Sequence, residues 1–494
     1  MQAISEADIK IRIARDNPWW SDVEYSIPES SYQRRVYFEP FKRLALNFGV
    51  RRATVLLGPR RVGKTVMIKQ IISEAISSGI ERNAILYVSI DAPVYSGISL
   101  QKFIDLMPTP DGEKCVVIFD EIQYLRDWEI HLKDLVDNHT NIKFIASGSA
   151  AAALQLKSRE SGAGRFSDFM LPPLTFYEFL SFLGEAEKFI TRVNGQADQN
   201  KSQYHIKDID GLNARFIDYL NFGGFPEAVV NEEIRSDPEQ FIKNDIIDKV
   251  LLKDLPSLYG ITGIQELNKL FSFLAYNAGN EASFENICRE SGIPKPTIKR
   301  YIEYLESAFL IIKVSTVDEN CKNMKRERNF KVYLNNPSMR AALFAPVKAE
   351  DTTLVGQLTE CAIFAQWQHS IVSKNLRYAR WRNEGEVDIV YIHGDQKPQW
   401  IGEIKWSDSI KKDWNRETSS LAALMKRHKS ISSAIFTTKT LDMASVLEGR
   451  PLRIHPSAAY CYIVGRNVTA THESELLTEV SKLTSDNEDV QSPS

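Results

Sequence analysis

Residues 58–65 read Gly-Pro-Arg-Arg-Val-Gly-Lys-Thr, which fits the pattern G-x-x-x-x-G-K-[ST] of a loop that wraps phosphate groups. Gly58 and Gly63 allow the backbone angles that turn N–H groups inward. Lys64 can reach β- and γ-phosphate oxygens, and the Thr65 hydroxyl can hold Mg²⁺. The octapeptide therefore predicts a site for a nucleoside triphosphate.

The flanking residues supply the context that such a loop requires. Residues 53–57 form an apolar run typical of a buried parallel strand, and residues 65–76 carry apolar side chains at helical spacing. A helix that begins at the loop adds its positive N-terminal end to the phosphate site. The residues predicted to bind nucleotide here are Gly58, Pro59, Arg60, Arg61, Val62, Gly63, Lys64, Thr65 and Val66.

A second buried-strand pattern, residues 115–119, ends in Asp120-Glu121. An aspartate at the carboxyl end of such a strand can hold Mg²⁺ through water. Glu121 is then placed to polarise a water for attack on the γ-phosphate, which is the task of a general base. The plainer alternative is an acidic pair that only caps a strand.

Further strands are expected at residues 84–90, between the two motifs in the sequence, and at 142–149. A strand between the P-loop and the acidic pair is typical of nucleotide hydrolases that use a glutamate base. Ser147 is the preferred γ-phosphate sensor, whereas Ser149 can equally cap the next helix. Arg165 is predicted to contact nucleotide as an arginine finger of a neighbouring subunit or as a sensor within its own chain, with a structural ion pair as the alternative.

Composition limits the remaining possibilities. The chain has 494 residues, which suggests about three domains, and a net charge of −3, so that nucleic-acid binding would require local basic patches. Its five cysteines lack paired spacing, which disfavours a disulfide framework and a zinc site. No stretch is long and apolar enough for a membrane span, and the start lacks a signal-peptide core. A cytoplasmic protein without a membrane partner is expected.

Changes of pattern along the chain suggest an α/β protein with several domains. A helix, a turn at Gly292, a second helix over 294–306 and a strand at 309–314 follow the order of a winged helix. The expected divisions are a helical lead-in (1–50), a P-loop ATPase core (51–182), a helical linker or lid (183–260), a winged helix (261–316), a C-terminal α/β domain (330–465) and a disordered tail (484–494).

Two basic clusters accompany the predicted winged helix. Lys295, Lys299 and Arg300 lie on the outer face of its second helix and can meet phosphates or base edges. A purely structural lid explains that helix as well. A basic run follows, which a solvated loop also explains: Lys322, Lys325, Arg326, Arg328 and Lys331.

The C-terminal pattern has the order αβββαβ, with helices at 356–368 and 414–429 and strands at 376–381, 386–392, 400–406 and 434–438. Residues two apart in a strand share a face, so Glu403 and Lys405 are expected to point together. Asp388 can join them across a hairpin.

This set suits metal-dependent cleavage of a phosphodiester. Asp388 and Glu403 offer oxygen ligands to Mg²⁺, which activates a bound water. Lys405 can orient that water or stabilise the developing charge, and Glu360 can reach the metal or its waters from the helix. A surface ion pair between Glu403 and Lys405 is the alternative.

Together these motifs resemble a bacterial and archaeal family of AAA-type ATPases related to the STAND group. Its members join a P-loop domain, a winged helix and a PD-(D/E)xK nuclease-like domain. The matching tracts are 58–65, 119–123 with Trp128, Gly148-Ser149, Gly164-Arg165, 173–178, 223–227, 332–333, Gly356 with Glu360, 386–388 and 403–405. The resemblance implies ATP with Mg²⁺ as cofactors and the three-domain architecture, and it suggests mobile-element or antiviral biology.

Two main functions compete. In the first, ATP binding and hydrolysis govern a nuclease whose partner is nucleic acid, with DNA favoured. In the second, the chain is a nucleotide-driven switch or binding module with an inactive nuclease-like domain. A winged-helix regulator is a third interpretation. A homo-oligomer or a partner protein is compatible with each of them.

Overall fold

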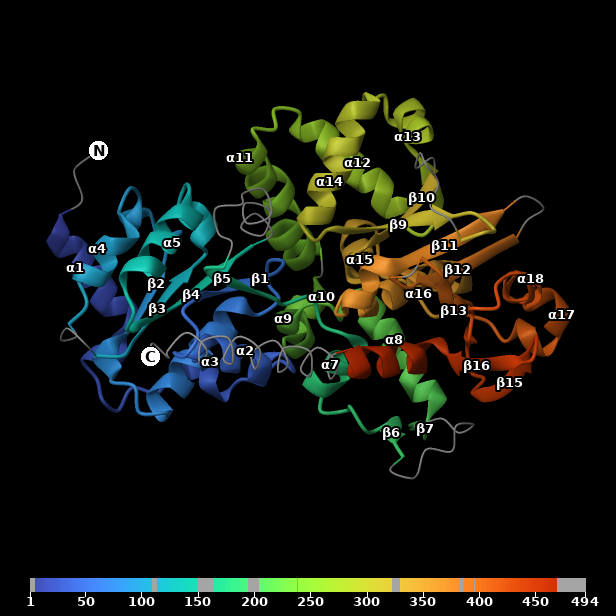
Figure 1. Cartoon of the computed structure of the whole chain (residues 1–494), viewed down its shortest axis with the longest axis horizontal. Helices are drawn as coiled ribbons and strands as arrows, with labels where there is room; N and C mark the ends of the chain where they lie inside the picture. The colour runs from blue at the N-terminus through green and yellow to red at the C-terminus, as the bar shows by residue number, and fades with distance from the viewer. Residues whose placement is uncertain are drawn as a thin grey trace, which may run out of the picture. The chain divides into compact units, whose positions relative to one another are not determined.

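The computed structural model of the chain describes residues 5–108, 113–149, 164–193, 204–237, 239–321, 329–381, 385–394 and 396–468. The described residues divide into two compact units, one within Met1–Pro172 and the other within Pro173–Thr471 (Figure 1). The predicted tail, 484–494, and four members of the basic run, Lys322, Lys325, Arg326 and Arg328, lie outside the described residues.

The first unit is built on a five-stranded parallel sheet in the order β2-β3-β4-β1-β5. Helices α4 and α5 cover one face, and α2 and α3 cover the other (Figure 1). The strands are β1 (Ala53–Leu57), β2 (Ile85–Ser89), β3 (Cys115–Asp120), β4 (Ile142–Gly148) and β5 (Phe166–Met170). The helices are α1 (Glu6–Asp16), α2 (Phe38–Ala45), α3 (Lys64–Ser77), α4 (Leu100–Asp105) and α5 (Trp128–Asn138).

The parallel sheet was expected, and a strand lies between those of the P-loop and the acidic pair, as is typical of hydrolases with a glutamate base. β4, and not the strand near residues 84–90, lies between β1 of the P-loop and β3 of the acidic pair. β2 is the edge strand instead. Strand order depends on long-range packing, so the order of elements in the sequence did not reveal it.

The lead-in before residue 50 covers the free edge of β2. The Asn17 side chain donates to the Tyr87 carbonyl at 2.8 Å and accepts from its N–H at 2.7 Å. The indole N–H groups of Trp19 and Trp20 both donate to the Ile85 carbonyl, at 3.1 and 2.8 Å. These side chains satisfy backbone groups that an edge strand would otherwise expose to another chain. The lead-in therefore packs against the ATPase core.

The second unit begins with helices and continues into a large mixed sheet. Its helices are α7 (Phe176–Phe182), α8 (Ile209–Phe222), α9 (Pro226–Val230), α10 (Glu232–Ser236), α11 (Leu255–Tyr259), α12 (Ile264–Tyr276), α13 (Phe284–Ser291), α14 (Lys295–Ser307), α15 (Ser338–Leu343), α16 (Thr352–Trp367), α17 (Trp414–Glu417) and α18 (Ser419–Arg427). Two π-helical segments cover Glu239–Asp248 and Val250–Asp254, and residues 457–468 are helical.

Nine strands form one sheet in the order β15-β16-β14-β13-β12-β11-β9-β10-β8. They are β8 (Glu281–Ser283), β9 (Ile311–Val317), β10 (Asn329–Leu334), β11 (Leu376–Trp381), β12 (Gly385–Ile392), β13 (Pro398–Glu403), β14 (Ser433–Thr438), β15 (Met443–Leu447) and β16 (Arg450–Pro456). A short hairpin pairs β6 (Ile190–Arg192) with β7 (Tyr204–Ile206).

The sheet crosses the expected division between a winged helix and a C-terminal domain. β9 pairs with β10 on one side and, in parallel, with β11 on the other, through Tyr378 opposite Thr316 and Ala379 opposite Val317. The helices α13 and α14 and the following strand are present near the predicted positions. The strands around these helices, β8, β9 and β10, nevertheless extend the C-terminal sheet. Side chains of β10 can therefore lie beside the predicted residues Glu360, Asp388 and Glu403.

A buried polar cluster joins the early helices of this unit to α16. The Gln366 side chain accepts from the Phe176 N–H at 2.8 Å and donates to the Tyr219 hydroxyl at 2.9 Å. Asn336 lies against Gly224 so closely that a Cβ on that glycine would be 2.3 Å from its side chain. The Gly223-Gly224 turn thus gives the backbone room to approach the β10–α15 connection.

Candidate functional site

The P-loop has the shape that the octapeptide predicts, although its two glycines act differently. Gly63 has a φ of 95° and Arg61 a φ of 64°, so the left-handed region occurs at these two positions of the loop. Gly58 is required for a different reason, because a Cβ there would lie 2.2 Å from the carbonyl oxygen of Leu171. The expectation that Gly58 supplies an unusual backbone angle is therefore wrong. Glycine is required there because the chain after β5 approaches too closely for a side chain.

Lys64 is poised inside the loop. Its side chain is 5% exposed, and its ammonium donates to the carbonyls of Gly58 at 3.0 Å and Pro59 at 2.7 Å. Arg35, also buried, donates to the carbonyls of Val62 and Pro172 and so ties the loop to the end of β5. The cradle is thus held in place by main-chain contacts that phosphate oxygens can replace at Lys64.

Asp120 is the centre of a hydrogen-bond network at the carboxyl edge of the sheet. Its Oδ2 accepts from the Thr65 hydroxyl and from the Tyr87 hydroxyl, each at 2.9 Å. Its Oδ1 accepts from the Ser147 hydroxyl and, at 3.1 Å, from the Glu121 N–H. The structure thus brings together Thr65, Asp120 and Ser147 as the sequence predicted. Thr65 and Asp120 fit a Mg²⁺ ion bound with phosphate, because two hard oxygen donors converge beside the cradle.

Glu121 is held at the same edge in a left-handed conformation with a φ of 56°. The Gln123 side chain donates through its Nε2 to the Glu121 carboxylate, and its Oε1 accepts from the Ser149 N–H at 3.2 Å. Sequence reasoning missed Gln123 and Tyr87, because only the folded sheet edge shows that they touch the acidic pair. The helix that Ser149 was expected to cap lies outside the described residues.

Arg165 does not reach the P-loop of its own chain. It pairs with Asp137, and its carbonyl accepts from the N–H of Ala53, the first residue of β1. Because β1 and β5 are parallel, Arg165 lies at the amino edge of the sheet, whereas the P-loop follows the carboxyl edge. The predicted role as a sensor within the chain is therefore wrong. The structure shows the alternative, a structural ion pair between Arg165 and Asp137.

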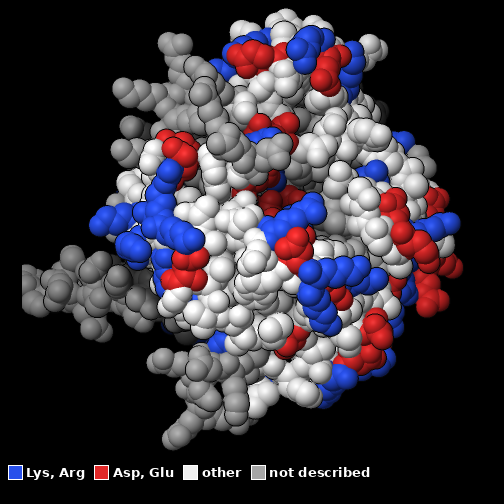
Figure 2. Space-filling view, turned by 90° about the vertical axis from the view of Figure 1, so that its right-hand side faces the viewer, with Lys and Arg blue, Asp and Glu red and all other residues white. Residues whose placement is uncertain are grey.

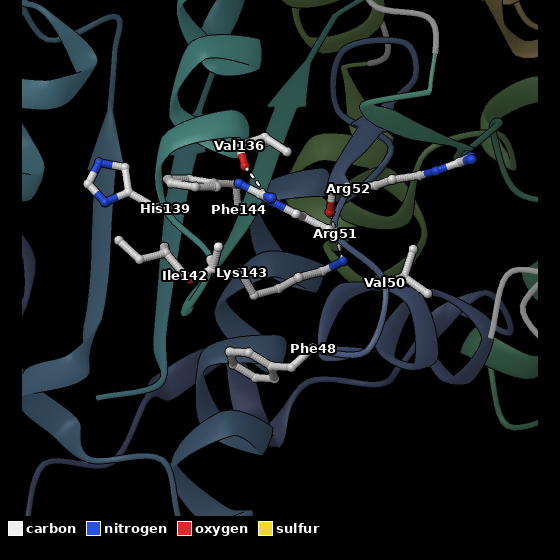
Figure 3. A pocket seen from close by; sticks show the side chains of 10 residues that line it. Phe48, Val50, Arg51, Arg52, Val136, His139, Ile142, Lys143 and Phe144 are labelled. Carbon is white, nitrogen blue, oxygen red and sulfur yellow. Dashed lines mark hydrogen bonds between the residues drawn. The ribbon is translucent and has the colours of Figure 1, made fainter. Parts of the chain in front are cut away.

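A small pocket lies at this amino edge (Figure 3). Arg51 donates to the Val136 carbonyl at 3.1 Å, and the buried Lys143 donates to the Arg52 carbonyl at 2.9 Å. Burial lowers the pKa of Lys143 to about 8. Arg51 and Lys143 thus both donate hydrogen bonds to backbone carbonyls of the pocket wall.

The second candidate site lies in the nine-stranded sheet. Its acidic side chains come from α16 (Glu360), β12 (Glu386 and Asp388) and the end of β13 (Glu403). Lys405 pairs with Glu403 at 2.8 Å, as predicted. However, β13 ends at Glu403, so Lys405 lies beyond the strand that was expected to carry both.

After β13 ends, the backbone N–H groups of Ile404 and Lys405 donate to side-chain oxygens and not to the carbonyls of a neighbouring strand. The Ile404 N–H donates to Asp388 Oδ2 at 2.8 Å, and the Lys405 N–H donates to the Thr437 hydroxyl at 2.9 Å. Asp388 thus joins the Glu403–Lys405 pair through the main chain. The structure brings all four predicted residues of this site, Glu360 included, into one cluster.

Lys331 is the residue that sequence reasoning misplaced. It was grouped with a basic run that either contacts nucleic acid or lies in a solvated loop. In the structure its side chain is 5% exposed, and its ammonium lies 2.8 Å from Glu386, 3.3 Å from Asp388 and 3.4 Å from Glu360. Burial alone would lower the pKa of Lys331, but the neighbouring Tyr333 and three carboxylates raise it. A lysine within the apolar run of β10 was the one available signal.

The cluster carries more negative charge than its lysines neutralise. Burial, followed by the charge of Asp388, raises the pKa of Glu403 to about 8 against the opposing effect of Lys405. The same two causes raise the pKa of Glu360 to about 7 against Lys331. In addition, Glu403 Oε2 is buried without a hydrogen-bond partner.

Glu403→Gln is expected to flatten the pH dependence of the stability of the second unit. The folded protein keeps the Glu403 proton up to about pH 8, whereas the unfolded chain loses it near pH 4.5. Between these values the unfolded state binds fewer protons, so the free energy of unfolding falls as pH rises, by at most about 1.4 kcal/mol per pH unit. Urea unfolding from pH 5 to 8 measures this slope, with the exposed Glu350→Gln as control. Parallel curves for wild type and Glu403→Gln would contradict the assignment.

The carboxylates do not fit the predicted Mg²⁺ ion as they are arranged. Within the described ranges, no group of three His, Cys, Asp or Glu side chains is placed to hold a metal ion. At this cluster the ammonium of Lys331 lies among the oxygens of Asp388, Glu360 and Glu386, where a cation would bind. The prediction that Asp388 and Glu403 bind Mg²⁺ is therefore wrong for this arrangement. The structure has a carboxylate cluster that is occupied by the Lys331 ammonium.

The basic face of α14 is partly used within the chain. Lys295 pairs with Glu285, and the Lys299 ammonium lies 5.2 Å from the centre of the Phe284 ring. Lys299 and Arg300 are both exposed. Figure 2 shows basic and acidic side chains interspersed on the face it draws, with acidic side chains set back in a hollow near its middle.

Comparison with known families divides the chain in a similar way. Residues 50–180 match a family described as an AAA domain (AAA_14), and residues 213–351 match a domain of unknown function, DUF8612. An uncharacterized protein of Methanocaldococcus jannaschii, MJ1637, is 28% identical over 56% of this chain and 59% of its own length. An uncharacterized protein of Haemophilus influenzae is 27% identical over 53% and 62%. The matched part of the chain thus spans about three fifths of these relatives.

Solved structures give only weak likenesses. Cdc6p of Pyrobaculum aerophilum is 14% identical over 69% of this chain and 96% of its own, with a TM-score of 0.28. A RuvB variant of Thermotoga maritima is 14% identical over 53% and 81%, with a TM-score of 0.26. Among the described residues, no helix has both the length and the apolar character needed to cross a bilayer.

The AAA match coincides with the parallel sheet, the cradle around Lys64 and the Thr65–Asp120 contact. This family implies ATP as the nucleotide, with Mg²⁺ as its usual ion. The second unit is a mixed-sheet domain that includes the DUF8612 match. The chain therefore contains an AAA-type P-loop ATPase domain, which is followed by a DUF8612 domain.

Proposed function

We propose that the chain hydrolyses ATP at the P-loop, with Glu121 as the general base. The contact between Thr65 and Asp120 at 2.9 Å carries this proposal, because it brings the two predicted ligands of Mg²⁺ together beside Lys64. Magnesium, when bound with ATP, neutralises phosphate charge. Lys64 then exchanges its loop carbonyls for β- and γ-phosphate oxygens. Ser147, bonded to Asp120 and to the Glu121 N–H, links the sensor strand to the base.

Glu121 is suited to take a proton from the attacking water. Its backbone is fixed by two hydrogen bonds from its N–H, to Asp120 and Ser147, so its carboxylate starts from a defined position. Gln123 holds that carboxylate and also bonds the chain after β4. Hydrolysis at this site thus depends on two adjacent strand ends, β3 and β4.

We further propose that the second unit acts on nucleic acid through the Glu403–Lys405 cluster, as a PD-(D/E)xK-like phosphodiesterase governed by the ATPase. The set of carboxylates with an adjacent, partly exposed lysine supports this, since Lys405 can stabilise charge on a phosphoryl oxygen. The exposed Lys299 and Arg300 on α14 supply phosphate contacts. DNA is the favoured polymer.

One observation favours the competing function, a nucleotide-driven switch whose acidic cluster does not cleave. The Lys331 ammonium pairs with three carboxylates where a metal-dependent nuclease needs a free cation site. In that case the second unit binds nucleic acid or a partner protein, and ATP changes its affinity.

A substrate survey with three variants separates these functions. Plasmid DNA, single-stranded DNA and RNA are incubated with ATP and Mg²⁺ and wild type, Lys64→Ala, Glu403→Ala or the exposed control Glu350→Ala. We expect cleavage of at least one polymer by wild type and the control, loss of cleavage but retained ATP turnover in Glu403→Ala, and loss of both in Lys64→Ala. ATP turnover without cleavage in wild type would favour the switch. Cleavage unchanged in Glu403→Ala would refute the assignment of cleavage to the Glu403–Lys405 cluster. Absence of ATP turnover in wild type would refute the ATPase proposal.

A further inference from the structure

The Asp120 carboxylate at the end of β3 is held at both of its oxygens. Among the described residues, Oδ1 accepts from the Ser147 hydroxyl and the Glu121 N–H, and Oδ2 accepts from the hydroxyls of Thr65 and Tyr87. Thr65 is the predicted Mg²⁺ ligand of the P-loop, so Oδ2 is the oxygen beside the ion's expected position. Of the two donors to Oδ2, Tyr87 is the one that is not itself a predicted ligand.

The Tyr87 hydroxyl can fix this oxygen while Thr65 turns to the ion. A carboxylate only accepts hydrogen bonds, so Tyr87 donates to Asp120, at 2.9 Å. The Thr65 hydroxyl has one proton to donate and lone pairs that can face a metal ion. Hydrogen bonds to an ionised carboxylate are among the stronger ones in proteins. Without the Tyr87 hydroxyl, Thr65 would be left to orient Oδ2 by itself.

Tyr87 is itself fixed from two sides. Its side chain is buried, and the Lys69 ammonium of α3 lies 3.4 Å from the centre of its ring, a favourable arrangement of a cation over an aromatic face. Its backbone lies in the edge strand β2, where Asn17 bonds both its carbonyl and its N–H, at 2.8 and 2.7 Å. A continuous series of contacts therefore runs from the lead-in through Tyr87 to Asp120, all within the first unit.

We propose that Tyr87 is a positioning residue of the ATP site, which holds Asp120 Oδ2 in place for Mg²⁺, and that Asn17 of the lead-in holds Tyr87 for this task. The inference rests on the proposed ATPase site and adds a role for the lead-in. Residues before the P-loop thereby influence how firmly the site retains Mg²⁺.

The first test compares two affinities of the full chain. Electron paramagnetic resonance gives the affinity of the protein for Mn²⁺ with a non-hydrolysable ATP analogue bound, and calorimetry in EDTA gives the affinity for the analogue alone. In Tyr87→Phe we expect the Mn²⁺ affinity to fall by about tenfold, because one hydrogen bond to a charged group is lost. The affinity for the analogue in EDTA should stay that of wild type.

Tyr95→Phe is the matched control for this change. The buried Tyr95 also donates its hydroxyl to a carboxylate, that of Asp16, at 3.3 Å, but Asp16 is not part of the P-loop site. Both affinities should be unchanged in this variant. A purely structural role of Tyr87 would lower the two affinities together, and so would contradict the proposal.

The second test is a double-mutant cycle on the lead-in. Asn17→Ala alone should lower the Mn²⁺ affinity several-fold, whereas in the Tyr87→Phe background it should add no further loss, since Asn17 acts through the Tyr87 hydroxyl. Trp20→Phe is the control, because it removes a lead-in contact to the Ile85 carbonyl, which keeps its bond from Trp19. If Tyr87→Phe does not fold, the comparison of Asn17→Ala with Trp20→Phe gives the same readout from a second position.

The possible failures are distinguishable. Equal Mn²⁺ affinities of Tyr87→Phe and wild type would overturn the role of Tyr87, and additive losses in the double variant would overturn that of Asn17. Absence of nucleotide binding in wild type would refute the ATP site itself, and this proposal with it. Neither readout requires hydrolysis.

Discussion

Glu121→Gln is expected to reduce ATP turnover by about 10²–10⁴-fold while ATP binding persists. Glutamine has almost the same shape as glutamate, but its amide cannot accept the proton of the attacking water. Asp120, Thr65 and Lys64 keep their contacts, because the backbone of residue 121 and not its carboxylate bonds to Asp120. Nucleotide binding and hydrolysis should therefore separate in this variant.

Two measurements on the same preparation test this. Phosphate release gives kcat, and titration calorimetry with ATP and Mg²⁺ gives Kd. The exposed Glu81→Gln in the same unit is the matched control and should leave both values unchanged. If Glu121→Gln turns over ATP at the wild-type rate, the base is another group and the assignment at the end of β3 fails.

Gly58→Ala is expected to abolish ATP binding and to destabilise the first unit by about 3 kcal/mol. An added Cβ would lie 2.2 Å from the Leu171 carbonyl oxygen and 3.2 Å from its carbon. Both atoms belong to the backbone, so relief requires the P-loop and the chain after β5 to separate. That movement would also break the alignment held by Arg35, which bonds Val62 and Pro172 on the two sides.

Gly356→Ala makes the same chemical change in the α16 helix and should have the opposite effect. The nearest atom to a Cβ there is 4.0 Å away, and alanine favours a helix by up to about 1 kcal/mol over glycine. Urea unfolding and ATP titration of the two variants give the comparison. An unchanged ATP affinity in Gly58→Ala would show that the loop relaxes without cost and would remove the proposed reason for this glycine.

The P-loop half of the protein was largely predictable because its determinants are local. The apolar run before Gly58, the helical spacing after Thr65 and the strand that ends at Asp120 each depend on residues close in sequence. The contact between Thr65 and Asp120 followed from one rule, that the carboxyl ends of parallel strands meet at one edge. The position of β4 between β1 and β3 did not follow, since strand order is decided by packing.

Arg165 shows how a correct motif can lead to a wrong role within the chain. The residue precedes a strand, as expected, but the direction of β5 places it at the edge opposite the P-loop. Gly164-Arg165 alone does not encode that direction. The parallel pairing of β5 with β1 does.

The C-terminal cluster was predicted in part, because Asp388, Glu403 and Lys405 lie on neighbouring segments of one hairpin. Lys331 was missed because 57 residues separate it from Asp388 in the chain. The basic residues around it suggested a surface loop, and the apolar neighbours Phe330 and Val332 were the weaker signal. Only the nine-stranded sheet shows that β10 delivers this lysine to the carboxylates.

The sequence by itself determined the nucleotide site, since Gly63, Lys64, Thr65 and Asp120 are fixed by backbone angles, side-chain reach and the register of short elements. Tertiary structure decided what the second site contains. Its charges come from α16, β10, β12 and β13, and their distances depend on how distant strands pair and curve. Electrostatic energy depends on those distances and on burial, so Lys331 is a counter-ion in the folded protein, whereas the sequence shows it only as one of several basic residues.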